Sequence, residues 1–93
     1  MDIEQHLKFG ESIRALRMSS RPVIARINER FTRNSKHARN AAALTEIIDQ
    51  LRDDLETDLY RNHREKYDGP IIGEVYRMNP KMSILEKLEL EVK

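Results

Sequence analysis

Histidines, paired carboxylates and arginines are the side chains of this 93-residue chain that could carry chemistry. His6, His37 and His63 lie far apart in the sequence, and no two of them have the His-x3-His spacing that puts both rings on one helix face. The chain has no cysteine, which excludes thiolate ligands, thiol nucleophiles and disulfides. We therefore expect no metal site and no cofactor, and we interpret the histidines as ordinary surface or packing residues.

Motifs for catalysis are missing as well. Neighbouring acids such as Asp53 with Asp54, or Glu56 with Asp58, have the spacing of a solvated helix face. The chain has three glycines and no Gly-x-Gly-x-x-Gly, Walker or Gly-x-Ser-x-Gly motif, so little of it could cradle a phosphate or present a nucleophile. The sequence therefore predicts a protein that is not an enzyme and has no catalytic residues.

Arginine is the chemistry-bearing residue that the sequence concentrates. Between residues 14 and 39, eight Lys and Arg stand against Glu29 alone, a net charge of +7, whereas residues 46–58 carry six acids against Arg52, a net charge of -5. Guanidinium groups at Arg26, Arg30 and Arg33 could hold phosphates of a phosphopeptide or a nucleic acid through bidentate contacts. Alternatively, these arginines pair with the acidic segment or are solvated, and contribute little.

The elements that must position these side chains are helices. From Ala41 to Leu59 apolar residues recur at spacings of three and four, which is the period of one helix face, while acids occupy the opposite side. The apolar positions are Leu44, Ile47, Ile48, Leu51, Leu55 and Leu59; the acids are Glu46, Asp49, Asp53 and Glu56. We expect this apolar stripe to be the interior contact of a helical bundle.

Start and stop signals divide the rest of the chain. A first helix is predicted over Ile3 to Met18, with a bend at Gly10, and Ser19, Ser20 and Pro22 predict the start of a second near Arg21. Asn34 and Ser35 predict a third helix from about Lys36, ended at residues 68–70 by Asp-Gly-Pro. Residues 71–92 fit either helices, which we favour, or a terminal hairpin.

These elements define the fold class. The sequence predicts an all-α, single-domain bundle of about four or five helices over residues 1–93, with the C-terminal quarter as the one segment that could instead be a short hairpin. No apolar run is long enough for a membrane span, the start of the chain lacks the pattern of a secretion signal, and the mean hydropathy is -0.73. We expect a soluble intracellular protein without a membrane partner.

One stretch resembles a known family. The residues that match are Phe9, Ser12, Ile13, Leu16, Met18, Ser20-Arg21-Pro22, Ile24, Ile27, Asn34 and Ala38. They are similar to the opening three helices of the RNA polymerase II CTD-interacting domain (CID) family, and Thr57-Asp58-Leu59-Tyr60-Arg61-Asn62 loosely resembles its Asp-Ser-Ile-x-Lys-Asn motif, with threonine in place of the peptide-binding aspartate.

The resemblance implies a nuclear protein that docks the polymerase's heptad-repeat tail, in its phosphorylated form, beside the second and third predicted helices. The peptide- or phosphate-binding residues would then be Arg21, Arg26, Arg30, Arg33, Tyr60 and Asn62. An extended peptide loses affinity to ordering, so a module of this size would bind weakly and gain from multivalency.

Two other functions fit the residues. A small regulatory or assembly subunit would bury leftover apolar surface against another protein or a second copy, since Met18, Met78, Met82 and Leu90 fall off the predicted core faces. A nucleic-acid-binding regulator would use the basic block 14–39. The sequence thus predicts a non-enzymatic helical interaction module whose partner is a protein or peptide, a nucleic acid, or another copy of the chain.

Overall fold

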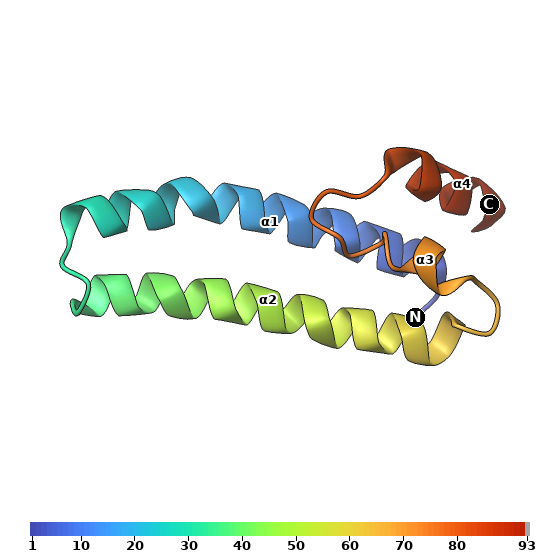
Figure 1. Ribbon diagram of the computed structural model, residues 1–93, viewed down its shortest axis with the longest axis horizontal. Helices are drawn as coiled ribbons and strands as arrows, with labels where there is room; N and C mark the ends of the chain where they lie inside the picture. The colour runs from blue at the N-terminus through green and yellow to red at the C-terminus, as the bar shows by residue number, and fades with distance from the viewer. Residues whose placement is uncertain (93) are drawn as a thin grey trace.

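The computed structural model describes residues 1–92 and consists of four helices (Figure 1). α1 (Ile3–Arg30) and α2 (Lys36–His63) form a long antiparallel hairpin, and α3 (Gly69–Ile72) and α4 (Met82–Val92) return along one end of it. Helix makes up 77% of the structure, and residues 1–92 contain no strand. The predicted all-α fold is therefore confirmed, and the C-terminal quarter is not a hairpin of strands.

The first two predicted helices are one. Asp2 caps α1 in a reciprocal pair of hydrogen bonds with Gln5, and the helix then runs unbroken through Pro22. The predicted second start at Ser19–Pro22 is wrong because the Ser20 hydroxyl, instead of capping, donates to the Arg17 carbonyl at 2.8 Å inside the helix. Proline in a helix interior costs about 3 kcal/mol. The helix nevertheless continues to Arg30, alongside α2 (Figure 1).

The second long helix begins where the sequence predicts. Ser35 caps α2, and its hydroxyl accepts a hydrogen bond from the Ala38 amide at 3.1 Å. α2 ends at His63, after which a turn leads to Asp68. The Asp-Gly-Pro segment, predicted only as a stop, also starts α3, because proline's missing donor costs nothing in a first turn.

The apolar stripe of α2 is only partly interior. Ile48 and Leu59 are buried, but Leu44, Leu51 and Ile47 are 39%, 45% and 64% exposed. α1 packs instead against the side of α2 that carries the small residues Ala38 and Ala41, both of which are buried. The expectation that the whole stripe lies inside a bundle is therefore wrong: its outer edge faces solvent.

The hydrophobic core lies at one end of the hairpin, which we call the head. Seven buried side chains from the start of α1, the end of α2 and the C-terminal segments form it: Ile3, Leu59, Ile72, Val75, Tyr76, Leu85 and Leu88. The opposite end, which contains the α1–α2 connection, is two helices thick (Figure 1). Here each helix can bury only the face that it turns toward the other.

A glycine lets the C-terminal segment cross α1. A Cβ atom added to Gly10 would lie 2.1 Å from the Val75 carbonyl oxygen, so only glycine permits this approach. The Arg14 guanidinium holds the crossing segment by donating to the carbonyls of Val75 at 2.7 Å and Arg77 at 3.3 Å. α1 continues through Gly10, and this glycine serves a close contact.

We predict that Gly10→Ala destabilises the protein. The added methyl group must displace the backbone at Val75, which costs roughly 1 to 3 kcal/mol and outweighs the gain of up to about 1 kcal/mol from alanine's helix propensity. Urea unfolding followed by circular dichroism measures the change. Gly69→Ala is the matched control, because nothing lies within 4 Å of an added Cβ there. Equal stability of wild type and Gly10→Ala would contradict the close contact.

Candidate functional site

Six exposed large apolar side chains share one flank of the hairpin formed by α1 and α2. Phe9, Leu16 and Val23 of α1 are 44%, 46% and 52% exposed, and Leu44, Ile47 and Leu51 of α2 are exposed to a similar extent. We call these six residues the open face. Single exposed apolar residues are ordinary, whereas a contiguous set marks a contact surface.

The α1 and α2 members of this set lie on one side of the hairpin. Phe9, Leu16 and Val23 are seven residues apart, so they fall within about 40° of helix rotation. Around the axis of α1, they lie roughly 80° from the buried side of the helix, counted against the direction in which residue numbers increase. Around the axis of α2, Leu44, Ile47 and Leu51 lie roughly 90° from its buried side, counted in the same way. When two antiparallel helices face each other, residues that are rotated from the buried side in the same sense lie on the same face of the pair.

Cross-helix contacts fix which residues are level with each other. Arg17 forms an ion pair with Asp49, and the His63 Nε2 lies 2.8 Å from the Met1 carbonyl oxygen. Residue n of α1 is therefore level with residue 65 - n of α2, to within about one position. Leu16 falls between Ile47 and Leu51, and Val23 is next to Leu44. The six side chains therefore lie on one flank of the hairpin at overlapping levels.

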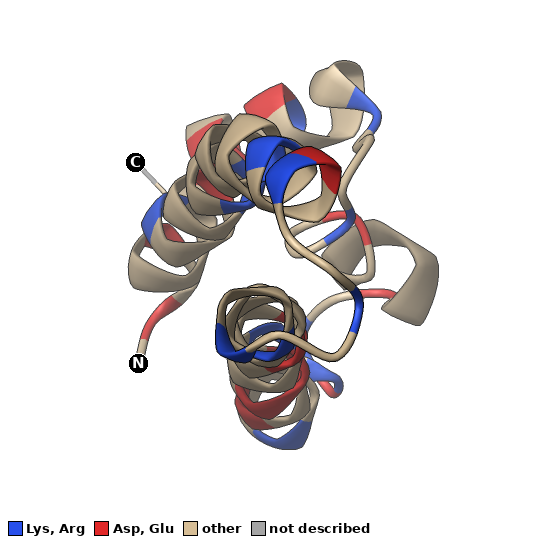
Figure 2. Ribbon diagram, turned by 90° about the vertical axis from the view of Figure 1, so that its left-hand side faces the viewer, with Lys and Arg blue, Asp and Glu red and all other residues tan. Residues whose placement is uncertain are grey.

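The C-terminal segments pack on the other side of the hairpin. Gly10 and Arg14 contact Val75. Around the axis of α1 they are rotated from the buried side in one direction, whereas the open face is rotated from it in the opposite direction. Seen from the turn end, α3 lies to one side of the α1–α2 pair and the opposite side has no layer over it (Figure 2). No helix within residues 1–92 covers the open face.

The molecule exposes more surface than a compact domain of its mass. A folded monomer of 11.0 kDa is expected to expose about 5,600 Å², and this chain exposes 6907 Å². Its radius of gyration is 15.9 Å, against about 12 Å for a compact domain of 93 residues. The excess of roughly 1,300 Å² exceeds the ~800 Å² that each partner buries in a standard protein interface.

The predicted arginines gather at the end of the hairpin that carries the α1–α2 connection. We call residues 21–39 the turn end; six Lys and Arg stand there against Glu29, a net charge of +5 (Figure 2). Arg21, Arg26, Arg30 and Arg33 are all exposed. Within residues 1–92 no acid forms an ion pair with them, so the expected alternative of pairing with the acidic segment does not occur.

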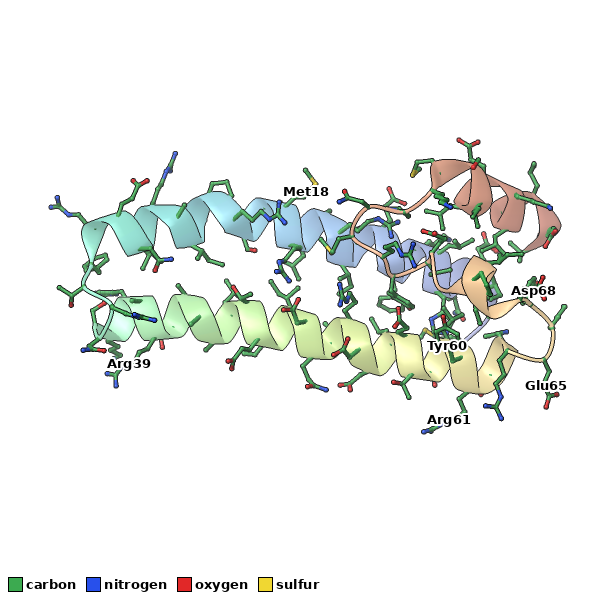
Figure 3. The ribbon with its side chains drawn as sticks, viewed as in Figure 1. Met18, Arg39, Tyr60, Arg61, Glu65 and Asp68 are labelled. Atoms are coloured by element: carbon green, nitrogen blue, oxygen red, sulfur yellow. The ribbon has the colours of Figure 1, made fainter. Side chains whose placement is uncertain are left out.

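Tyr60 and Asn62 are not near those arginines. Tyr60 lies at the head and Arg39 at the turn end (Figure 3), and the helix rise puts Tyr60 about 30 Å from the level of Arg26. The Tyr60 hydroxyl donates to the Gly69 carbonyl at 3.2 Å, and the Asn62 amide donates to Asp58 at 3.2 Å. Tyr60 thus packs against α3, and the predicted site residues divide between two ends of the molecule.

A buried polar cluster lies in the head. His6 and Tyr76 are almost completely buried, and the Tyr76 hydroxyl oxygen lies 2.5 Å from Nδ1 of His6. The Nε2 atom of His6 faces Asp58, with 3.4 Å between Nε2 and the carboxylate oxygen, and makes no hydrogen bond. Asp58 is partly exposed, whereas the imidazole is sealed from solvent, so no substrate can reach the ring.

Burial sets the protonation states of this pair. Burial, together with the nearby Asp58 and Glu56, raises the pKa of Tyr76, so its hydroxyl stays protonated and donates to Nδ1. The imidazole proton then resides on Nε2, facing Asp58. Burial also lowers the pKa of His6, opposed by Asp58 and reinforced by His63 and the terminal amine. His6 is therefore a neutral core residue.

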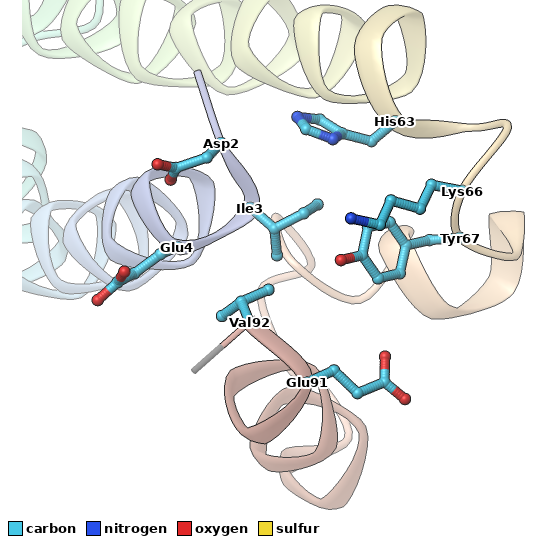
Figure 4. A pocket seen from close by; sticks show the side chains of 8 residues that line it. All are labelled: Asp2, Ile3, Glu4, His63, Lys66, Tyr67, Glu91 and Val92. Carbon is cyan, nitrogen blue, oxygen red and sulfur yellow. The ribbon is translucent and has the colours of Figure 1, made fainter.

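The head also carries a shallow pocket between the start of α1, the end of α2 and the end of α4 (Figure 4). Asp2 and Glu4 line one side of it, His63 and Lys66 the other, and Glu91 of α4 lies at a third edge. No group of three His, Cys, Asp or Glu residues in the described part of the chain is placed to hold a metal ion. None of the helices described over residues 1–92 has the length and hydropathy needed to cross a membrane.

Comparison with family models, with curated proteins and with solved structures finds no match to this chain. The CID resemblance therefore stays a prediction. It implies three helices over residues 9–62, and the structure has two.

Sequence reasoning did not identify the cluster around His6. The signal was present: Ile3, His6, Gly10, Ile13 and Arg17 recur at spacings of three and four, and they face the protein interior. Reading apolar residues alone selects Phe9 and Leu16 instead, which are exposed. A helix face that mixes apolar, small and polar residues is not detected when only the spacing of apolar residues is considered.

We predict that His6 makes the protein less stable in mild acid. The folded-state pKa of His6 is below its ordinary value of 6.5, so below that pH the unfolded chain binds the proton more readily and unfolding is favoured. One such group contributes at most about 1.4 kcal/mol per pH unit.

Urea midpoints at pH 7.5 and 5.5 measure this loss. His6→Gln, which keeps an acceptor and a donor, should reduce the difference between the two midpoints, and His37→Gln at the exposed turn end should not. An unchanged pH dependence in His6→Gln would show that another group is responsible.

Proposed function

We propose that the chain is a non-enzymatic helical interaction module that binds a partner protein through the open face. The observation that carries the proposal is the strip of six exposed apolar side chains along both hairpin helices. Burying one such side chain from water contributes about 1.5 to 3 kcal/mol. A helix or helix pair laid along the strip would complete the bundle that α1 and α2 begin.

We expect the open face to be covered in the cells from which the chain comes. Photochemical carbene footprinting can compare the purified chain at high dilution with the same chain in a cell extract. Leu16 and Ile47 should be labelled several-fold less in the extract, because a partner excludes the reagent. Met18 and Leu90, which are exposed on other faces, are the matched controls. Equal labelling of Leu16 and Ile47 in both samples would reject the proposal.

The basic turn end supports a second candidate function, the binding of phosphate groups on an extended peptide. Arg26, Arg30 and Arg33 are exposed and have no acidic partner within residues 1–92. Their guanidinium forks suit phosphate oxygens. The CID resemblance implies such a ligand. A peptide that reached from these arginines to Tyr60 would need about nine extended residues, since each residue spans about 3.3 Å.

We predict for this candidate that a two-repeat phosphorylated heptad peptide shifts the amide signals of residues 20–39, and that added salt weakens the binding. Arg26→Gln with Arg30→Gln should remove most of the affinity because two guanidinium donors are lost. Arg61→Gln with Arg64→Gln, two exposed arginines at the head, is the control. Shifts of equal size with the unphosphorylated peptide, or none with either, would exclude phosphate recognition.

A further inference from the structure

We infer that the partner on the open face is a second copy of this chain, bound antiparallel, so that two hairpins form a four-helix bundle. The inference rests on the proposed function, because it names the occupant of the same surface. Three properties of the open face support it: the symmetry of its pattern, the distribution of charge along the hairpin, and the amount of surface available.

The pattern of the open face is self-complementary. In a two-fold interface, if residue i of one copy contacts residue j of the other, then residue j of the first copy contacts residue i of the second. Leu16 lies at the middle of α1 (Ile3–Arg30), with Phe9 and Val23 seven residues away on either side. An axis beside Leu16 therefore brings Leu16 to Leu16 of the second copy and Phe9 to its Val23.

The same axis also relates the α2 residues. Leu16 is level with residue 49, so the axis passes between Ile47 and Leu51 and brings Ile47 to Leu51 of the second copy. Leu44 lies farther toward the turn end and faces about residue 54 of the second copy. One two-fold axis thus pairs five of the six apolar side chains with apolar side chains, and the two hairpins overlap along their whole length.

Charge favours the antiparallel direction. In this arrangement the turn end, with its net charge of +5, lies over residues 2–11 of the second copy and over residues 54–63, which are level with them. Those segments carry six Asp and Glu against Lys8 and Arg61, a net charge of -4. A parallel pair would instead place one basic turn end beside the other. Opposite charges at facing ends select the antiparallel partner.

The extended shape of the chain leaves surface that a dimer can bury. The roughly 1,300 Å² by which the chain exceeds a compact monomer is larger than the ~800 Å² that each partner of a standard interface buries. The strip is about 21 Å long from Phe9 to Val23 and crosses both helices. Apolar positions at seven-residue spacing are those that pack between helices of a bundle.

Light scattering after gel filtration, with the purified chain at about 100 µM, tests whether the chain self-associates. A dimer with a dissociation constant of about 1 µM or lower would be mostly formed at that concentration. We expect the mass of a dimer, twice 11.0 kDa. Leu16→Glu should give a monomer with unchanged helix content, because it places two like charges at the axis. Met18→Glu, two residues away and exposed on another face, should remain dimeric.

Single cysteines test the direction, because the chain has none of its own. Leu16→Cys should oxidise to a covalent dimer, and Asn34→Cys in the hairpin turn should not, since the two turns are at opposite ends. A monomer at 100 µM, a dimer that survives Leu16→Glu, or a covalent dimer through Asn34→Cys would each overturn the inference. A monomer whose open face is nevertheless protected in cell extract would reject the second copy as partner and leave the proposed function standing.

Discussion

The arrangement of the molecule depends on how closely the C-terminal segment approaches α1 at Gly10. Because this residue has no side chain, the backbone at Val75 lies against the helix, where Arg14 holds two of its carbonyls. Tyr76 then reaches His6, and the residues that follow carry α4 back over the head. The core forms where these segments meet. The C-terminal quarter of the chain covers the head and does not extend to the turn end.

The remaining length of the hairpin has only two helices, and this determines its chemistry. Two helices bury one face each, and here the buried positions toward the turn end are largely small, such as Ser20, Ala38 and Ala41. Small residues remove little apolar area from water. Six larger side chains lie on the flank, where they are only about half buried and contribute less to the stability of a lone chain than fully buried residues would.

The helical character of the chain, the cap at Ser35 and the start of α2 could be predicted from sequence, because they depend on local propensity and capping. The end of α2 at His63 comes before the Asp-Gly-Pro stop that the sequence predicts at residues 68–70. The continuity of α1 through Pro22 could not be predicted, because serine followed by proline is also the ordinary signal of a helix start. Nor could the exposure of Leu44 and Leu51, since periodicity shows that a stripe exists but does not show which edge a partner covers. The arginines were evident from composition, whereas their separation from Tyr60 follows from the hairpin's length.

Pro22 has a consequence for how the hairpin opens. Without an amide hydrogen at that position, the carbonyl of Met18 lacks its usual donor, and the ladder of main-chain bonds in α1 has a gap between the head and the turn. Beyond the gap, only the facing stretch of α2 holds the helix. We expect local unfolding to begin there, so that exchange of amide protons with solvent is fastest around the turn and slowest near Leu59. The chain thus combines a firmly folded base with a more readily melted tip.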